Sequence, residues 1–309
     1  MTDFVVYNEE QKDITNNKFH LFQIKYDDII DPHFTKSKAT DFVVYNEEQK
    51  YVTNNIFKLD KFHLFKSIYD ARDHIYSPPP LKKSIETFSI DLRPLCSKIE
   101  DQENLGSCTG QAFAGIVEFL KKKQNINIEI SRLFIYYNER LLRNTIKYDS
   151  GATIRDGIKA ISMYGCCSEK LYPHIIKDFT NKPSKNAYLD GSKRKAVSYK
   201  SIINFDDMKK SLINKNPVII GFIVYSSFYK INKTGIMSYP SITQEIVLGG
   251  HAVLIVGFND NYLNTNKGYF ICRNSWGVNW GDKGYFYMPY DVIKNRNMSF
   301  DFWIITSIT

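Results

Sequence analysis

Cys108 stands where a nucleophilic thiol could be activated. It follows Gly106 and Ser107 and opens an apolar pattern of helical spacing that runs to Lys123. One face of that pattern carries Ala112, Phe113, Ile116, Val117 and Leu120. The free amides and dipole at a helix N-terminus stabilise a thiolate. A buried structural cysteine would fit the same position, so the rest of the chain must supply the partners of a thiol site.

A cysteine nucleophile needs an imidazole that takes its proton and returns it to the leaving amine. Only two histidines follow Cys108. His174 lies in a Tyr-Pro turn, where a surface role is favoured. His251 lies behind Gly249 and Gly250 at the start of the apolar run HAVLIVGF, which predicts a strand that presents the ring to a cleft. We therefore expect His251 to be the general acid/base.

Three further side chains would complete such a site. Asn274 could orient the imidazole, and Trp276 could shield their hydrogen bond from water. Gln102 precedes the thiol by six residues, and its amide could point back at the oxygen that becomes negative during acyl transfer. The backbone N–H of Cys108 would be the second donor.

The elements that must position these side chains change in character along the chain. Helical spacing is found over residues 108–123, 131–144 and 153–164. Short β-rich runs separated by Asn, Asp and Gly turns occupy residues 217–225, 251–258, 267–272, 283–288 and 301–305. The pattern predicts an α+β fold with a helical lobe over about 91–210, an antiparallel sheet or barrel lobe over about 211–309, and the site in the cleft between them.

The first 88 residues form an arm of different texture. Residues 2–12 (TDFVVYNEEQK) recur unchanged at 40–50, and KFHLF occurs at 18–22 and 61–65. Two copies are too few for a self-supporting solenoid, so the arm is expected to pack on something else. The Ser-Pro-Pro-Pro run at 77–80 marks the linker, and the catalytic domain is expected over 89–309.

Composition excludes several classes of protein. With 309 residues, 43% of them hydrophobic, the chain can bury a large core, and it shows neither a signal peptide nor a run of eighteen uncharged apolar residues. Five cysteines are an odd number that favours reduced thiols over a disulfide framework. We therefore expect a reducing compartment such as the cytoplasm, no membrane association and no metal, with packaging in a virus particle left open.

The net charge of +8 is unevenly distributed, because residues 1–90 carry 12 basic and 14 acidic side chains. The basic remainder favours acidic substrates or partners slightly. The run Ser-Lys-Arg-Lys at 192–195 lacks any aromatic or recognition motif beside it, so nucleic acid is not an expected partner.

Three ordered blocks resemble the papain/cathepsin family of cysteine peptidases. They are QENLGSC at 102–108, GGHAV at 249–253 with VGF at 256–258, and NSWGVNWG at 274–281 with GY at 284–285. The interval from the cysteine to the histidine fits the spacing known for this family. The resemblance covers about residues 91–309.

The resemblance implies a two-lobed papain-like fold with no cofactor. By this similarity Cys108 is the nucleophile, His251 the general acid/base, Asn274 the orienting residue and Gln102 the oxyanion donor. Side chains and backbone that would bind an extended polypeptide substrate are those of Ser150, Gly151, Ala152, Gly250 and Trp276, the last on the leaving-group side. Because such peptidases are commonly made as zymogens, the arm is expected to act as an intramolecular inhibitor, with a docking arm as the alternative.

This sequence departs from the family pattern at three places. Leu105 replaces a cysteine that is disulfide-bonded in secreted members, Thr109 replaces an aromatic residue after the nucleophile, and Ala152 stands where a glycine is expected. No insertion resembles the histidine-bearing loop of cathepsin B, so endopeptidase action is favoured. Two rivals remain open: a catalytically silent peptide-binding protein and an acyltransferase on the same residues.

Overall fold

The computed structural model describes residues 19–21, 44–46, 61–79, 88–261 and 267–309. The chain divides into two compact units, residues 1–58 and 59–309. In the first unit, β1 (Phe19–Leu21) pairs antiparallel with β2 (Val44–Asn46). Residues 2–12, the first copy of the repeat, lie outside the described residues, and of the second copy only β2 is described.

The second unit contains an antiparallel sheet in the order β10-β9-β8-β7-β11-β6, with β4 also paired to β8. Its strands are β4 (Ser89–Asp91), β6 (Ala196–Ser201), β7 (Val218–Tyr225), β8 (Val247–Asn259), β9 (Tyr269–Arg273), β10 (Tyr285–Pro289) and β11 (Ser299–Ile308). The β-rich runs seen in the sequence thus all become strands of one sheet. The edge strand β6 comes from the stretch assigned to the helical lobe.

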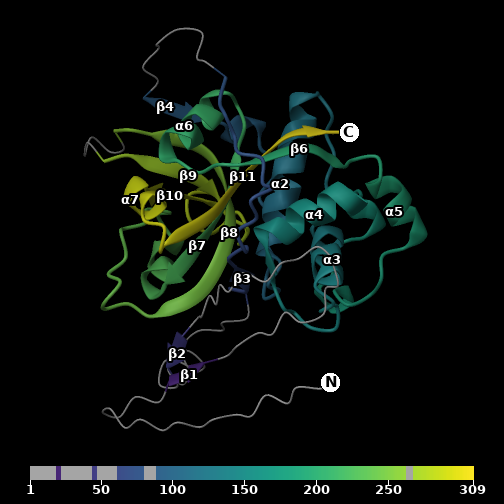
Figure 1. Cartoon of the computed structure of the whole chain (residues 1–309), viewed down its shortest axis with the longest axis horizontal. Coiled ribbons are helices and arrows are strands. Elements are labelled where there is room, and N and C mark those ends of the chain that lie inside the picture. The colour runs from purple at the N-terminus through teal and green to yellow at the C-terminus, as the bar shows by residue number, and fades with distance from the viewer. Residues whose placement is uncertain (1–18, 22–43, 47–60, 80–87, 262–266) are drawn as a thin grey trace. The chain divides into compact units, whose positions relative to one another are not determined.

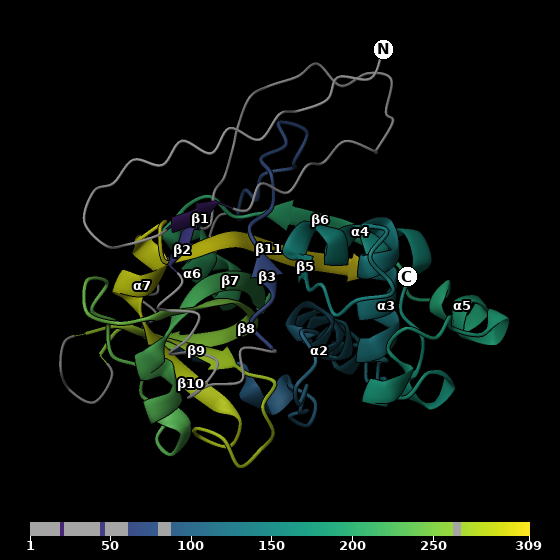
Figure 2. The same cartoon turned by 90° about the horizontal axis from the view of Figure 1, so that it is seen from below.

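Among the described residues of this unit, four helices form the helical side, and two short helices connect strands of the sheet. The four are α2 (Cys108–Lys123), α3 (Arg132–Leu142), α4 (Ile154–Tyr164) and α5 (Lys185–Gly191), and the two are α6 (Phe205–Ile213) and α7 (Tyr290–Lys294). Figures 1 and 2 show α2 between the sheet and the layer of α3 and α4. This arrangement confirms the predicted α+β fold with a helical and a sheet lobe.

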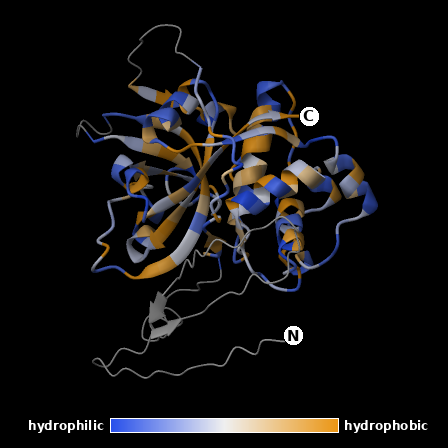
Figure 3. Ribbon diagram, viewed as in Figure 1, coloured by the Kyte–Doolittle hydropathy of each residue, from blue (hydrophilic) through white to orange (hydrophobic). Residues whose placement is uncertain are grey.

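The positions of these helices follow from local chemistry. Ser131 caps α3 by accepting the amide of Phe134, and Thr153 forms a capping box with Asp156 at the start of α4. Since α2 lies between two layers, its residues 108–121 are all buried (Figure 3 shows its apolar colouring). At Gly110 a Cβ would lie 2.6 Å from the Arg132 carbonyl oxygen, so glycine is needed for α2 and α3 to approach.

Residues 61–79, which the sequence assigned to the arm, pack within the second unit. β3 (Leu64–Phe65) pairs in parallel with β5 (Ala152–Thr153). Beyond β3, the Ser67 amide donates to Asp301 at 2.6 Å, and Arg155 forms an ion pair with Asp73. This part of the arm is therefore held on the two lobes by both backbone and charge.

Within the residues described, no helix is long and apolar enough to cross a membrane.

Candidate active site

Cys108 is the first residue of α2, as the sequence predicts. Its side chain is fully buried, and the thiol accepts a hydrogen bond from the backbone amide of Ala252. Ala252 follows His251 on β8, so the thiol from the helical lobe lies against the strand that carries the histidine. The structure thus brings together two residues that are 143 positions apart in the sequence.

His251 and Asn274 are joined by a hydrogen bond of 2.8 Å between Nε2 and Oδ1. Both residues are buried, and Asn274 directly follows the end of β9 at Arg273. Because an amide oxygen only accepts, Nε2 must carry the hydrogen and Nδ1 keeps its lone pair. Nδ1 has no hydrogen-bond partner among the described residues, so this nitrogen is the one left free to accept a proton.

Aromatic rings enclose this pair. The indole of Trp276 lies against the imidazole of His251, with 5.1 Å between the ring centroids and 33° between the planes. Phe222 meets the imidazole edge-on from β7, and Phe228 packs against Trp276. These rings exclude water from the His251–Asn274 hydrogen bond, as the sequence predicts for Trp276.

Gln102 is fully buried, and its amide is held in one orientation. Ser275 donates to its Oε1 at 2.6 Å, and the Gln102 backbone amide donates to the Ser275 carbonyl at 2.8 Å. Its Nε2 donates to Leu105 at 3.0 Å and reaches the carbonyl of Lys61 at 3.4 Å. The contribution of Ser275, which lies between Asn274 and Trp276, could not be inferred from the sequence.

Residues 61–66, here called the covering segment, lie over this group of side chains. The Lys61 ammonium is 4.0 Å from the centroid of the Trp276 ring. Phe62 is 4% exposed and meets His251 and Trp276 edge-on at 6.0 and 5.6 Å between centroids. Leu64 is 5% exposed and lies where a Cβ on Gly221 of β7 would come within 2.7 Å. The buried state of Cys108 and His251 therefore belongs to a form whose site is covered.

Four of the five predicted substrate-binding residues contact the covering segment. Ala152 pairs with Leu64, and Gly250 forms a parallel bridge with His63. A Cβ on Gly151, whose φ is +66°, would lie 1.8 Å from the His63 carbonyl oxygen, so this position requires glycine. The backbone of the covering segment therefore comes closest to this loop at Gly151, whereas position 152, where a glycine is expected from the family, accommodates alanine.

Trp276 is the fourth of these residues, and Ser150 is the exception. The Ser150 hydroxyl lies 2.7 Å from that of Thr145 and donates to the Gly151 carbonyl. Ser150 therefore shapes the loop, and its side chain is used within the loop itself.

The covered site disfavours both ionised forms. Burial raises the pKa of the Cys108 thiol to about 12, although the Ala252 amide opposes the shift. Burial likewise lowers the pKa of His251 to about 4; the Asn274 hydrogen bond opposes this, and the Lys61 ammonium adds to it. The sequence predicts a thiolate at position 108, but the covered structure favours a neutral thiol beside a neutral imidazole. The reason is that the arm removes water from both groups.

The loop before β5 meets the covering segment through Asp149. Its carboxylate accepts from the Gly106 amide at 2.9 Å and from the Tyr136 hydroxyl. Its carbonyl accepts from His63 Nδ1 at 3.0 Å. Asp149 therefore ties the turn before the nucleophile to both α3 and the covering segment, a role that no spacing rule in the sequence indicates.

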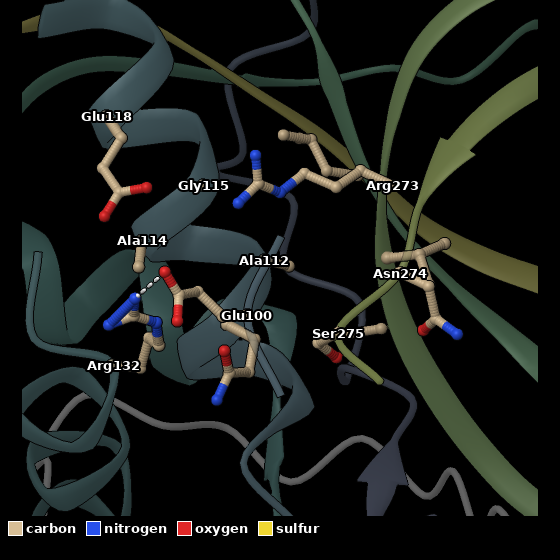
Figure 4. A pocket seen from close by; sticks show the side chains of 13 residues that line it. Glu100, Ala112, Ala114, Gly115, Glu118, Arg132, Arg273, Asn274 and Ser275 are labelled. Atoms are coloured by element: carbon tan, nitrogen blue, oxygen red, sulfur yellow. Dashed lines mark ion pairs between the residues drawn. The ribbon is translucent and has the colours of Figure 1, made fainter. Parts of the chain in front are cut away.

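A small cavity of about 10 Å³ lies next to the site, between α2 and β8–β9. Figure 4 shows Glu118 and Arg132 on its helical side and Arg273 and Asn274 on its strand side. Arg132 is 2% exposed and pairs with Glu100 at 2.7 Å. The cavity has room for about one water, so it is no substrate pocket, and its ion pair fixes the segment that carries Gln102.

This geometry defines a thiol–imidazole–amide hydrolase site built across two lobes. Comparison with known proteins agrees: the model of the papain family of cysteine proteases matches residues 87–301. The chain belongs to this family, and it is a cysteine-type peptidase.

Two relatives show how far the similarity extends along the chain. An uncharacterized peptidase C1-like protein of Acanthamoeba polyphaga mimivirus is 41% identical over 280 residues, which cover 80% of this chain and 87% of the relative. Cathepsin S of Bos taurus is 26% identical over 227 residues, 70% of this chain and 63% of the relative. The chain thus spans less than two thirds of that cathepsin.

Solved structures share the fold. Xylellain, a cysteine protease from Xylella fastidiosa, superposes with a TM-score of 0.75 at 34% identity and covers 81% of this chain and 97% of its own. Digestive procathepsin L 3 of Tenebrio molitor gives a TM-score of 0.59 at 17% identity, with 81% and 80% covered. The second likeness shows the fold alone.

Proposed function

We propose that this protein is a cysteine endopeptidase and that Cys108 is its nucleophile. His251 Nδ1 takes the thiol proton, and the thiolate adds to the peptide carbonyl. The C–N bond then breaks as the imidazolium returns the proton to the amine, which leaves an acyl-enzyme that water hydrolyses. Asn274 supports this assignment because it holds Nε2 and leaves Nδ1 for the thiol. The Nε2 amide of Gln102 is the proposed donor to the oxyanion.

An extended polypeptide is the proposed substrate. The backbone of the covering segment already pairs with Ala152 and approaches Gly151 and Gly250 closely. A substrate strand could use the same backbone groups, because main-chain pairing is independent of side-chain identity. Trp276 would then form the wall on the leaving-group side.

The arm is proposed to keep the enzyme as a zymogen. The observation that carries this proposal is that residues 61–66 contact Gln102, His251 and Trp276 at once. The segment runs from Trp276 towards Ala152, whereas a substrate would place its acyl part at Ala152 and its leaving amine at Trp276. An inhibitor with this reversed direction covers the site while its own peptide bonds are presented the wrong way round for cleavage.

Variants of the full chain test the zymogen. Phe62→Ala with Leu64→Ala, here called the opened variant, removes two buried side chains that hold the covering segment, each worth on the order of 2–4 kcal/mol in a packed site. We expect it to hydrolyse a fluorogenic peptide library at least about tenfold faster than the wild type. Ile68→Ala is the matched control, since Ile68 is 62% exposed just beyond the segment.

Four results would contradict these proposals. Equal hydrolysis by the wild type and the opened variant would argue for a docking arm. Hydrolysis that survives Cys108→Ala would remove the assigned nucleophile. An epoxide label that attaches to Cys108 without any turnover would instead point to a catalytically silent peptide binder, and incorporation of an added amine in excess of hydrolysis would point to an acyltransferase.

A reducing compartment is proposed for the working enzyme. All five cysteines are free and buried in the structure: Cys96, Cys108, Cys166, Cys167 and Cys272. Protein isolated from its source under alkylating, non-reducing conditions should give five blocked thiols, and any disulfide-linked pair would contradict this proposal.

A further inference from the structure

A buried hydroxyl–carboxyl pair lies one residue from the proposed nucleophile. Thr109, the second residue of α2, donates its hydroxyl to Glu139 Oε2 on α3 at 2.6 Å. Both side chains are fully buried. Thr109 is also the position where the sequence departs from the aromatic residue usual in the family, so this pair is a feature of the present chain.

The Glu139 carboxyl is sealed on its other side by α4. A Cβ on Gly157 would lie 2.7 Å from Oε1 and 2.0 Å from the ring of Phe113, so only glycine lets α4 close over the carboxyl. Oε1 has no hydrogen-bond partner among the described residues. Among the described residues, a buried carboxylate in this position would accept one hydrogen bond, from the Thr109 hydroxyl, which is a poor substitute for water.

Charged groups act on Glu139 from α4 and from the C-terminal end of α3. Asp156 on α4 disfavours a second negative charge, whereas Arg140 on α3 and Arg143, which directly follows α3, favour it. Arg143 pairs with Asp156 at 3.2 Å, and Arg140 donates to backbone carbonyls such as that of Ile146 at 2.8 Å. From α2, the Thr109 hydroxyl faces it, and the Cys108 thiol interacts with it electrostatically.

Ionisation of Glu139 and of the thiol oppose each other. Burial raises the pKa of Glu139 to about 8, while the Thr109 hydroxyl opposes the shift. In turn, a charged Glu139 raises the pKa of Cys108, as does Asp149. The carboxyl thus changes charge within the range in which a peptidase operates, and it does so beside the helix terminus on which the thiolate depends.

We propose that Glu139 is a positioning residue for the nucleophile, acting through the Thr109 hydroxyl: its neutral acid permits the Cys108 thiolate, and its ionised form opposes it. The ionised carboxyl thereby shifts thiolate formation to higher pH. This inference rests on the proposed role of Cys108. It assigns to Glu139 no contact with the substrate.

Alkylation of Cys108 by iodoacetamide between pH 5 and 10 tests the proposal, with the adduct quantified by peptide mass spectrometry. The protein is the full-length opened variant with and without Glu139→Gln. We expect equal rates at pH 6, where both side chains are neutral, and a rate about threefold or more higher for Glu139→Gln at pH 9.5, which corresponds to about half a pKa unit in the thiol. The same ratio of alkylation rates, with and without Glu139→Gln, is also measured in the protein with wild-type Phe62 and Leu64. There the covering segment lowers the two rates alike.

Two further variants keep the test sharp. Thr109→Val removes the hydroxyl that stabilises the carboxylate, so Glu139 should ionise at higher pH. The pH above which alkylation becomes slower than in Glu139→Gln should therefore rise. Glu118→Gln is the matched control. Glu118 is also a buried glutamate with a raised pKa, but it lies ten residues after Cys108 on α2 and accepts a hydrogen bond from the Ile130 amide. Its alkylation profile should match that of the unsubstituted protein.

A Glu139→Gln ratio that is the same at pH 6 and pH 9.5 would overturn the proposal, because a merely structural role has no reason to depend on pH. If the pH at which alkylation becomes slower than in Glu139→Gln is unchanged in Thr109→Val, the route through the hydroxyl is overturned. Neither result touches the proposed function, since alkylation needs no peptide substrate. Conversely, an alkylation profile as expected in a protein without hydrolytic activity would count against the peptidase mechanism only.

Discussion

The surroundings of His251 and those of Cys108 differ in the kind of group that faces each. Aromatic rings of Phe62, Phe222 and Trp276 enclose the imidazole. On the thiol side, the carboxyls of Glu139 and Asp149 act on the Cys108 pKa. The pKa of the base is therefore controlled mainly by access of water, with a smaller contribution from the Lys61 ammonium, whereas the pKa of the nucleophile is controlled by water and by negative charge.

This difference teaches how one segment can silence both groups. When residues 61–66 cover the site, desolvation moves the thiol pKa up and the imidazole pKa down. Proton transfer from Cys108 to His251 is then unfavourable at both ends. Release of the segment would return water to both groups and so favour the pair of Cys108 thiolate and His251 imidazolium. The effect of Glu139 on the Cys108 pKa would persist.

The largest effect is expected from Gln102, the proposed oxyanion donor, which belongs to neither of the two surroundings compared above. Gln102→Ala in the opened variant should lower kcat by about 10²–10³-fold with a smaller change in KM, because it removes a donor to the transition state. Steady-state hydrolysis of a peptide measures this. Ser275→Ala, which only frees Oε1 of Gln102, should lose less. A change confined to KM would show that Gln102 binds the substrate and does not stabilise the oxyanion.

Stability should reveal the charge-sensitive side of the site. The folded-state pKa of Glu139, about 8, exceeds the ordinary value of 4.5, so the protein releases a proton on unfolding between these pH values and loses stability as the pH rises. Glu139→Gln should therefore gain up to about 1.4 kcal/mol relative to the wild type for each pH unit from 4.5 to 8, and nothing further above. Urea unfolding at several pH values measures the slope. A difference that is constant with pH would refute the buried neutral acid.

Acid should act on the water-sensitive side. The covered state lowers the pKa of His251 from 6.5 to about 4, so it binds fewer protons than an open state and is lost as the pH falls through this range. The ratio of wild-type to opened-variant hydrolysis should rise by up to about tenfold per pH unit on acidification from 6.5 to 4. Taking the ratio cancels the pH dependence of the chemistry itself. A ratio that does not change would mean that covering is independent of the imidazole charge.

The smallest effect is expected from the cation beside the base. Lys61→Met keeps the length of the side chain but removes the charge over Trp276, worth about 0.5–1 kcal/mol in such a contact. Because the same charge lowers the pKa of His251, its removal brings the covered-state pKa closer to that of the open state, so hydrolysis by Lys61→Met should rise less steeply on acidification. Hydrolysis at neutral pH measures the lost contact, and the steepness of the rise on acidification measures the pKa effect. An unchanged steepness would leave desolvation as the whole cause of the pKa shift.

Local patterns in the sequence were enough for the elements that carry the site. The helix predicted over 108–123 is found with those bounds, because its apolar stripe and its start at Cys108 are properties of neighbouring residues. The β-rich runs around His251 and Asn274 likewise became β8 and β9. The residue types required for acyl transfer are few, so their order along the chain was enough to propose the site residues before any coordinates.

Only the tertiary structure decided which part of the arm covers the site and which carboxyl faces the nucleophile. The KFHLF copy at 61–65 has the same letters as the copy at 18–22, yet in the first unit residues 19–21 form β1, whereas Leu64 and Phe65 pair with β5. Thr109 and Glu139 meet because α2 and α3 pack closely at Gly110. Such contacts depend on the register and distance of elements far apart in the chain, and local periodicity carries no information about either.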